Sequence, residues 1–476
     1  MELWKNSVEE LIRLLKLAEV ASGEIYRTFY TRIEKYDDVI KAFLSVKKIA
    51  EMIPHDQGIP FAVKDNILIK GTRTTCASRM LWNYDSAFTA TAVQHLIRND
   101  MYPIGKTNMD EFSMGSTTEN SSYHITKNPW DLKRVPGGSS GGSAAAVSAG
   151  FVPFALGSDT GGSIRQPASF CGVVGFKPSY GLVSRNGLVA FASSFDQIGT
   201  LTRSVRDTAL ITDMISGDCF YDATKKNFKK DYFSEIERGI SGDQIAIIKE
   251  SVSSIRNRDI HKRFDEAIEV LKWSGAEISW ISFPEFANLF RIYTILTTAE
   301  ASSNLARYDG LKYGLKIKNE DDLETLYRDT RDTGFGEEVK KRILLGTYHL
   351  SFKNFEAYYS KALKLREAVC RQIEELFLEY DAIITPVTSD TPGLIGEKQT
   401  LDKKAVYDMN TVIANIAGIP AISVPMGMSG NVPAGLQIMT ARFSESRLFR
   451  IARAYEKNAG IFEDGHYPFP HLEESV

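Results

Sequence analysis

The chain has 476 residues, of which 43% are hydrophobic and 25% charged, and its formal net charge at pH 7 is −3. Such a chain can bury a large core, either in two or three domains or in one large α/β domain. Nucleic-acid binding depends on neutralising phosphates, so this charge balance argues against the chain being the main site that holds a nucleic acid. The basic cluster at residues 225–230 is interpreted as a solvated surface.

The cysteines and the first residues of the chain indicate in which cellular compartment the protein is expected. The four cysteines are widely spaced and form no CxxC or Cys/His pairing. This pattern favours a reduced, intracellular protein without disulfides or a structural zinc. Residues 1–5 lack the apolar segment of a signal peptide, and no apolar run reaches the roughly 18 residues of a membrane span. We therefore expect a cytoplasmic protein that does not span a membrane and binds no metal.

The first half of the chain alternates between helix and strand patterns. Apolar periodicity predicts helices over residues 7–50, and a compact strand begins at Ile59 and ends in Lys64, Asp65 and Asn66. A helix over 90–99 and a strand over 102–106 follow, then a helix of small residues over 144–150 and a short strand over 152–156. This alternation continues to about residue 217 and predicts a βα-rich core over residues 58–217.

The second half begins with a different pattern. Residues 225–359 are predicted to form long charged helices, including 259–273 and 337–345. Strands return at 381–386, 421–425 and 435–439, and a helix over 446–457 closes the chain. Strands at both ends favour one sheet that residues 360–476 complete, with residues 1–57 as N-terminal helices. No linker is long enough to separate independent domains.

Two glycine-flanked serine loops, at residues 137–143 and 157–163, are the most distinctive stretches. Glycine lets backbone approach backbone or ligand closely, so such loops can present N–H groups and hydroxyls to a small molecule. A flexible Gly/Ser linker is the alternative, and it fits poorly with the apolar segments on either side. Residues 137–141 also match G-x-S-x-G, the nucleophile motif of α/β-hydrolases, but polar residues rather than a buried strand precede them.

Lys64 is the candidate base. A lysine that is partly buried at a strand end loses solvation of its charged form, so its pKa falls. To act as a base near pH 7, its pKa must drop by about 3 units from ~10.4. A solvated strand-end lysine is the alternative, and the sequence also leaves a histidine base open.

Taken together, Lys64 and the two serine loops resemble the amidase signature family. Ser139 lies 75 residues after Lys64, and Ser163 lies a further 24 residues on. The resemblance implies that Ser163 is the nucleophile, that Ser139 is a bridging serine at or before a cis peptide bond, and that Lys64 is the base. It also implies an oxyanion site made by four backbone N–H groups, those of Thr160, Gly161, Gly162 and Ser163.

The resemblance extends over almost the whole chain and implies a fold. The expected architecture is a single α/β domain in which a large mixed, mostly parallel sheet is covered by helices on both faces. Residues 299–310 and 334–342 lie outside the stretches common to the family. They resemble the branch of the family that hydrolyses glutamine within the bacterial tRNA-dependent amidotransferases.

That branch implies a glutamine pocket formed by Tyr293, Arg342 and Asp408. An arginine suits the α-carboxylate of glutamine, and an aspartate suits its α-ammonium group. From the residues alone, Arg342 could instead be a charge on a helix surface and Asp408 an acid in a loop.

The same branch implies a heterotrimer with B and C subunits. The B subunit would hold the aminoacyl-tRNA, ATP and Mg²⁺, and the present chain would bind no cofactor and would release ammonia for its partner. The sequence leaves open whether Glu-tRNA(Gln), Asp-tRNA(Asn) or both are amidated. Two rival functions are a stand-alone amidase and a catalytically silent scaffold subunit.

Overall fold

Eleven strands form one sheet in the computed structural model, which describes residues 2–48, 58–226, 231–317, 322–397, 407–463 and 465–474. The described strands are β1 (Phe43–Val46), β2 (Ile59–Lys64), β3 (Met101–Thr107), β4 (Phe154–Asp159), β5 (Val174–Lys177), β6 (Gln197–Thr202), β7 (Gln244–Ile248), β8 (Glu277–Ile281), β9 (Ala382–Pro386), β10 (Ala421–Ser429) and β11 (Val432–Met439). Across the sheet they follow the order β1-β3-β2-β4-β6-β5-β10-β11-β9-β7-β8. Late strands therefore complete a sheet that early strands begin, which confirms the predicted single mixed sheet.

The prediction of a mostly parallel sheet is wrong. Among the described strands, six of the ten neighbouring pairs are antiparallel. A parallel neighbour needs a crossover connection, usually a helix. β6 lies between β4 and β5 and is antiparallel to both, because the segment 178–196 that precedes it contains no helix. β10 and β11 form a hairpin around Gly430 and Asn431, where Gly430 has φ +60°.

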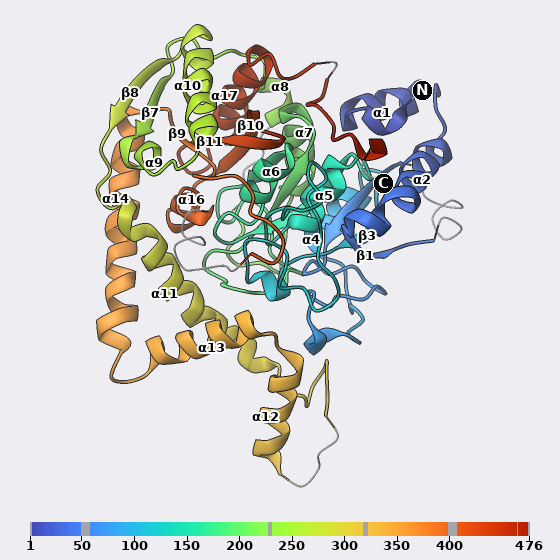
Figure 1. Cartoon of the computed structure of the whole chain (residues 1–476), viewed down its shortest axis with the longest axis vertical. Helices are drawn as coiled ribbons and strands as arrows, with labels where there is room; N and C mark the ends of the chain where they lie inside the picture. Colours follow the sequence, from blue (N-terminus) through green and yellow to red (C-terminus); the bar gives the residue numbers. More distant parts are fainter. Residues whose placement is uncertain are drawn as a thin grey trace.

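Helices cover both faces of the sheet (Figure 1). The described α-helices are α1 (Val8–Lys16), α2 (Ser22–Ile40), α4 (Thr91–Ile97), α5 (Gly141–Ser148), α6 (Arg165–Cys171), α7 (Val205–Ile215), α8 (Tyr232–Glu235), α9 (Lys249–Ser253), α10 (Arg258–Trp273), α11 (Phe286–Asn304), α12 (Leu323–Gly334), α13 (Glu337–Leu350), α14 (Lys361–Glu379), α16 (Val412–Ile416) and α17 (Glu445–Asn458). Ile245 and Ile247 of β7 pack in the same core cluster as residues of α10 and α17. Their neighbours Ala246 and Ile248 pack in a second cluster with α11 and α14. The alternation of side chains along a strand thus places one helical layer on each face.

Three of the predicted elements are corrected by the structure. The helix predicted up to residue 50 ends at Ile40, and four residues of edge strand β1 follow it. The strand predicted at 152–156 begins two residues later and reaches Asp159. The region 225–359 is not all helical, because β7 and β8 lie within it. Both strands are only five residues long and stand among charged helices, so the average composition of the region conceals them.

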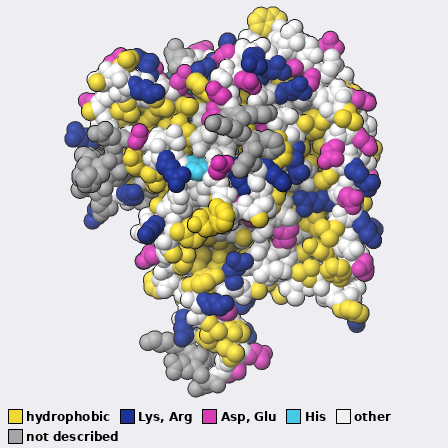
Figure 2. Space-filling view, turned by 180° about the vertical axis from the view of Figure 1, so that it is seen from behind, with side chains coloured by type: hydrophobic (Ala, Val, Ile, Leu, Met, Phe, Trp, Pro, Cys, Tyr) yellow, Lys and Arg dark blue, Asp and Glu magenta, His cyan; other side chains and the backbone are white. Residues whose placement is uncertain are grey.

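The basic cluster predicted at residues 225–230 lies partly outside the described residues, because it continues past Lys226 into residues 227–230. On the face drawn in Figure 2, Lys and Arg side chains alternate with Asp and Glu, without a field of one sign.

Helices α11, α12 and α13 form an arm that extends from the body (Figure 1), and α12 projects farthest. α11 and α13 are in close contact where Gly346 of α13 lies against the carbonyl of Thr298. His349 Nδ1 also lies 3.2 Å from Thr298 Oγ1. This contact matters for the site described below, because it sets the distance between two helices that both contribute to it.

Gly346→Ala is expected to destabilise the chain by about 1–3 kcal/mol, because an inserted methyl group must force the packed helices apart. A Cβ at this position would lie 1.9 Å from Thr298 O. Thr347→Ala, at the exposed neighbouring position, is the matched control. Denaturant unfolding of both variants checks this, and equal midpoints would contradict the close contact.

Candidate active site

Lys64 is the last residue of β2, a strand that is buried along its whole length between β3 and β4. Its Nζ lies 2.7 Å from Ser139 Oγ and 2.9 Å from Ser158 Oγ. Burial lowers the pKa of Lys64 to about 7, although the carboxylates of Asp110 and Asp159 favour its charged form. Burial therefore decides against a solvated lysine, and a substantial fraction of Lys64 is neutral near pH 7, as a general base requires.

The first serine loop leads from β3 and its following segment into α5. The Gly138–Ser139 peptide bond is cis, as the family resemblance implies. The N–H of Gly138 donates to Gln166 Oε1 at 2.9 Å, and the N–H of Ser140 donates to the carbonyl of Ser163 at 3.0 Å. These two bonds hold the loop of Ser139 against the loop of Ser163, although the two are far apart along the chain.

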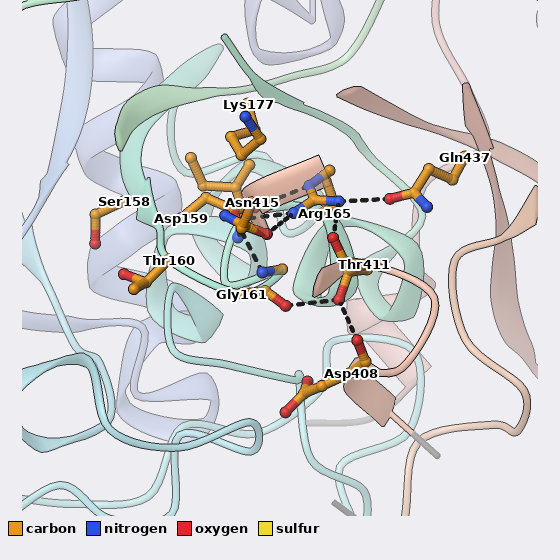
Figure 3. A network of polar contacts seen from close by, with 12 residues as sticks. Ser158, Asp159, Thr160, Gly161, Arg165, Lys177, Asp408, Thr411, Asn415 and Gln437 are labelled. Carbon is orange, nitrogen blue, oxygen red and sulfur yellow. Dashed lines mark hydrogen bonds and ion pairs between the residues drawn. The ribbon is translucent and has the colours of Figure 1, made fainter. Parts of the chain in front are cut away.

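The second serine loop is held by a buried ion pair between Asp159, at the end of β4, and Arg165, at the start of α6. The closest N···O distance is 2.9 Å, and both side chains are fully buried. Figure 3 shows that Arg165 also reaches three residues from the C-terminal part of the chain. It donates to the carbonyl of Thr411 (2.8 Å), to Asn415 Oδ1 (2.7 Å) and to Gln437 Oε1 (2.5 Å). Burial alone would raise the pKa of Asp159, but the charge of Arg165 holds it well below its usual range.

The backbone N–H groups of the second loop do not all point the same way. The N–H of Gly162 donates to Asp159 Oδ1 at 2.8 Å, so this predicted oxyanion donor is already engaged. Within the described ranges, the N–H groups of Gly161 and Ser163 have no hydrogen-bond partner. The hydroxyl of Thr160 donates to Asp196 Oδ1 at 2.6 Å.

Two glycines of this loop are required by close contacts. A Cβ on Gly161 would lie 2.4 Å from the ring of Tyr293, and one on Gly162 would lie 2.2 Å from Thr411 Oγ1. Gly162 also has φ +124°, a conformation that other residues rarely adopt. The hydroxyl of Thr411 donates to the carbonyl of Gly161 at 2.7 Å and to that of Asp408 at 2.9 Å (Figure 3). The loop is therefore fitted between α11 and the segment that carries Asp408.

A cavity of about 420 Å³ brings the predicted nucleophile and the predicted glutamine-binding residues together. Its lining includes Ser163 from the core, Tyr293 from α11, Arg342 from α13 and Asp408 from the segment before α16. Lys64 and Ser139 are fully buried, whereas Ser163 is 8% exposed. Four of the six predicted residues thus line one cavity, which has charges of both signs. The other two, Lys64 and Ser139, are bonded to each other, and the loop of Ser139 is bonded to that of Ser163 through the N–H of Ser140.

Two of the charged residues that line the cavity, Arg342 and Asp408, are held by neighbours that the sequence prediction missed. Arg342 Nε donates to Glu338 Oε1 at 3.0 Å, and both side chains are largely buried. Asp408 Oδ2 accepts a hydrogen bond from Ser116 Oγ at 2.7 Å. Arg342 and Asp408 both line the same cavity as Ser163, and their role in binding glutamine stays a prediction. The spacing of Glu338 and Arg342, one helical turn apart, was a signal in the sequence that could have identified the pair.

Known proteins resemble the chain over most of its length. The family model described as Amidase matches residues 24–449. The chain belongs to the amidase family. This match covers the serine loops, the arm and all of the C-terminal strands β9, β10 and β11, and it makes the chain an enzyme of this family with the amidase signature fold.

Individual proteins of the family that resemble this amidase carry a more specific name. It is 49% identical over 475 residues to the A subunit of glutamyl-tRNA(Gln) amidotransferase from Thermotoga maritima, with 99% of each chain covered. It is 48% identical to the protein of the same name from Caldanaerobacter subterraneus, with 96% of this chain and 97% of the relative covered. A crystal structure of the Thermotoga maritima protein superposes with a TM-score of 0.86 at 46% identity and covers 98% of both chains.

Three further observations concern metal binding, membrane-spanning helices and cysteines in this amidase. Among its described residues, no cluster of His, Cys, Asp and Glu is placed to hold a metal ion. None of its described helices has both the length and the apolar character needed to cross a bilayer. The four cysteines are free thiols, and Cys76 and Cys171 are buried.

The pKa of Lys64 leads to a prediction about stability. The pKa of Lys64 is about 7 in the folded enzyme and ~10.4 in the unfolded chain, so the unfolded chain binds the proton more tightly. This difference lowers the free energy of unfolding below pH ~10.4, and the loss shrinks as pH rises from about 7 toward that value. Lys64→Met removes this titrating group, so only the wild type gains stability as pH rises. The free energy of unfolding of Lys64→Met relative to the wild type should therefore fall between about pH 7.5 and 9.5. The change should be up to about 1.4 kcal/mol per pH unit.

Urea unfolding of both proteins across this pH range provides the measurement. Lys353→Met, at an exposed position, should show a pH-independent difference from the wild type. A similarly flat difference for Lys64→Met would contradict a lowered pKa.

Proposed function

We propose that this amidase is the glutamine-hydrolysing A subunit of a tRNA-dependent amidotransferase. The observation that carries the proposal is the cavity in which Arg342, Asp408 and Tyr293 stand around Ser163. The opposite charges of Arg342 and Asp408 match the α-carboxylate and α-ammonium groups of an amino acid, and Ser163 supplies the hydroxyl that attack on its carboxamide requires. The names of the two close relatives support the same function.

The reaction begins with neutral Lys64. As Ser163 Oγ bonds to the carboxamide carbon, its proton passes to Ser139 Oγ, and the proton of Ser139 passes to Lys64 Nζ, 2.7 Å away. Protonated Lys64 then returns a proton through Ser139 to the amide nitrogen, the C–N bond breaks, and ammonia leaves. Water cleaves the remaining acyl ester and yields glutamate and free Ser163. No cofactor is required in this cycle.

The negative charge that develops on the carbonyl oxygen needs N–H donors. We assign this role to the backbone of Thr160, Gly161 and Ser163, two of whose N–H groups, those of Gly161 and Ser163, lack partners in the described chain. Donors that are already oriented stabilise an oxyanion without reorganisation. The N–H of Gly162 could join them only by leaving Asp159.

The ammonia would serve partner subunits. In the proposed heterotrimer the B subunit holds aminoacyl-tRNA, ATP and Mg²⁺, and a C subunit completes the assembly in the cytoplasm. The absence of a net positive charge agrees with tRNA being held mainly by the partner. Large exposed apolar side chains in the second half of α13 and just after it support contact with another subunit: Leu344 is 70% exposed, Tyr348 50% and Phe352 98%.

Ser163→Ala is expected to abolish glutamine hydrolysis without unfolding the chain, because it removes one hydroxyl at the edge of a cavity. A glutamine analogue that carries an electrophile in place of the carboxamide should label Ser163. Mass spectrometry of the labelled peptide is the measurement. A label on Ser139 or on a cysteine would overturn the assignment of the nucleophile.

Partner dependence separates an amidotransferase subunit from a stand-alone amidase. Ammonia release from glutamine should be compared for the chain alone, for the complex with B and C subunits, and for the complex with acyl-tRNA and ATP. If a partner changes substrate affinity, the expected gain is about 5- to 150-fold, the usual range of such coupling. Equal rates in all three samples would favour the stand-alone amidase, and no hydrolysis in any sample would favour the silent scaffold.

A further inference from the structure

Glu111 is a buried carboxyl residue that joins the core to the arm, and it does not line the cavity. It is 1% exposed and lies in the segment after β3. Its Oε2 accepts the N–H of Gly336 at 2.8 Å, and its Oε1 accepts the hydroxyl of Ser78. Gly336 is the N-cap of α13, and the hydroxyl of Ser78 also bonds to the carbonyl of Gly334, the last residue of α12. One carboxylate therefore holds the junction of α12 and α13 against the core.

The position of Gly336 depends on its small size. A Cβ there would lie 2.5 Å from Glu111 Oε2, so only glycine lets the carboxylate reach the backbone. A negative charge at a helix N-terminus is favoured by the unpaired N–H groups and the helix dipole. Burial nevertheless raises the pKa of Glu111 to about 7, against the hydrogen bonds from Ser78 and Gly336 that favour its charged form. In either protonation state, the hydrogen bond from the N–H of Gly336 anchors the first turn of α13.

The segment that carries Glu111 also contacts the reacting groups. The N–H of Asp110 donates to the carbonyl of Ser139 at 3.3 Å. Ser113 Oγ accepts from Asn66 Nδ2 at 2.9 Å, and the same amide donates to Ser158 Oγ, which is bonded to Lys64.

Farther along, the same segment contacts the predicted glutamine-binding residue Asp408, since Ser116 Oγ donates a hydrogen bond to its carboxylate. Phe112 and Ser113 have positive φ values of 49° and 64°, conformations that persist in non-glycine residues only where the surroundings hold them. The segment is thus a rigid connection with Ser139 at one point, Asp408 at another and Glu111 between them.

α13 transmits the position of this anchor to the cavity. Arg342 and Glu338 both lie on α13, within two turns of Gly336. Arg342 is one wall of the cavity, whereas Ser163 and Lys64 belong to the core. A small rotation of α13 would move the guanidinium without moving the serine, and misplacement by about 1 Å is enough to weaken binding or catalysis strongly.

We propose that Glu111 is a positioning residue that sets where Arg342 stands relative to Ser163, and so determines the affinity for the α-carboxylate of the substrate. This inference rests on the proposed glutaminase function. It assigns a role to a residue that touches neither the substrate nor the reacting atoms, and it makes the junction of α12 and α13 a determinant of substrate specificity.

The test compares Glu111→Ala and the conservative Glu111→Gln in the full-length chain with its partner subunits. Glu337→Gln is the matched control, because Glu337 is an exposed carboxylate in the same first turn of α13. Three amides are used: glutamine, glutaramic acid, which lacks the α-ammonium group, and 4-aminobutanamide, which lacks the α-carboxylate. Hydrogen–deuterium exchange of α13 is measured in parallel for every protein, whether or not that protein hydrolyses the amides.

Glu111→Ala should raise KM for glutamine and glutaramic acid by about tenfold, because a displaced Arg342 would hold the substrate carboxylate less well. Its kcat/KM for 4-aminobutanamide should stay within about twofold of the wild type, since that substrate does not use Arg342. Glu111→Gln should recover part of the affinity, and amides of the first turn of α13 should exchange faster in Glu111→Ala than in Glu337→Gln.

Equal losses on all three amides would overturn the inference, because Glu111 would then act on the core rather than on Arg342. Unchanged KM for glutamine or unchanged exchange in α13 would overturn it as well. If the wild-type complex hydrolyses no glutamine, the proposed function fails instead, whereas the exchange measurement still reports whether Glu111 anchors α13.

Discussion

The buried pair of Asp159 and Arg165 is the interaction on which the site depends most. Two charges in a fully buried position are costly unless each is paired and surrounded by hydrogen bonds. Here the aspartate binds the N–H of Gly162, and the arginine binds the segment before α16 and strand β11. The same pair therefore shapes the loop of Ser163 and ties the first half of the sheet to the half that the C-terminal segment supplies. Removing either partner would leave an uncompensated charge at the centre of the molecule.

Lys64 is also a buried basic residue, but its partners differ from those of Arg165. Arg165 has a carboxylate in direct contact, whereas the nearest partners of Lys64 are the hydroxyls of Ser139 and Ser158. Hydroxyls stabilise an ammonium less than a carboxylate does, so desolvation prevails and the pKa falls to about 7. The two buried cations thus differ because of their partners: Arg165 is paired with a carboxylate, and Lys64, which is not, can lose its proton near pH 7.

The cavity is built from two bodies with different character. Ser163 and its hydrogen-bonded neighbours belong to the sheet core, where nearly every residue is buried. Tyr293 and Arg342 come from α11 and α13 of the arm, which is more exposed and extends away from the sheet (Figure 1). The reacting groups are therefore fixed by the core, and the groups proposed to recognise the substrate are supplied by the part of the molecule that is most open to partners.

The sequence by itself determined the serine loops, the candidate base and the order of most elements, because glycine spacing and hydrophobic periodicity are local properties of the chain. The family resemblance added Tyr293, Arg342 and Asp408, which no local pattern singles out. Only the tertiary structure decided that β7 and β8 belong to the sheet, and that antiparallel neighbours predominate. It also decided that the N–H of Gly162 is engaged by Asp159 and that Glu338 holds Arg342. Burial and hydrogen bonding between distant segments settle such points, and neither is encoded in the residues next to a position along the chain.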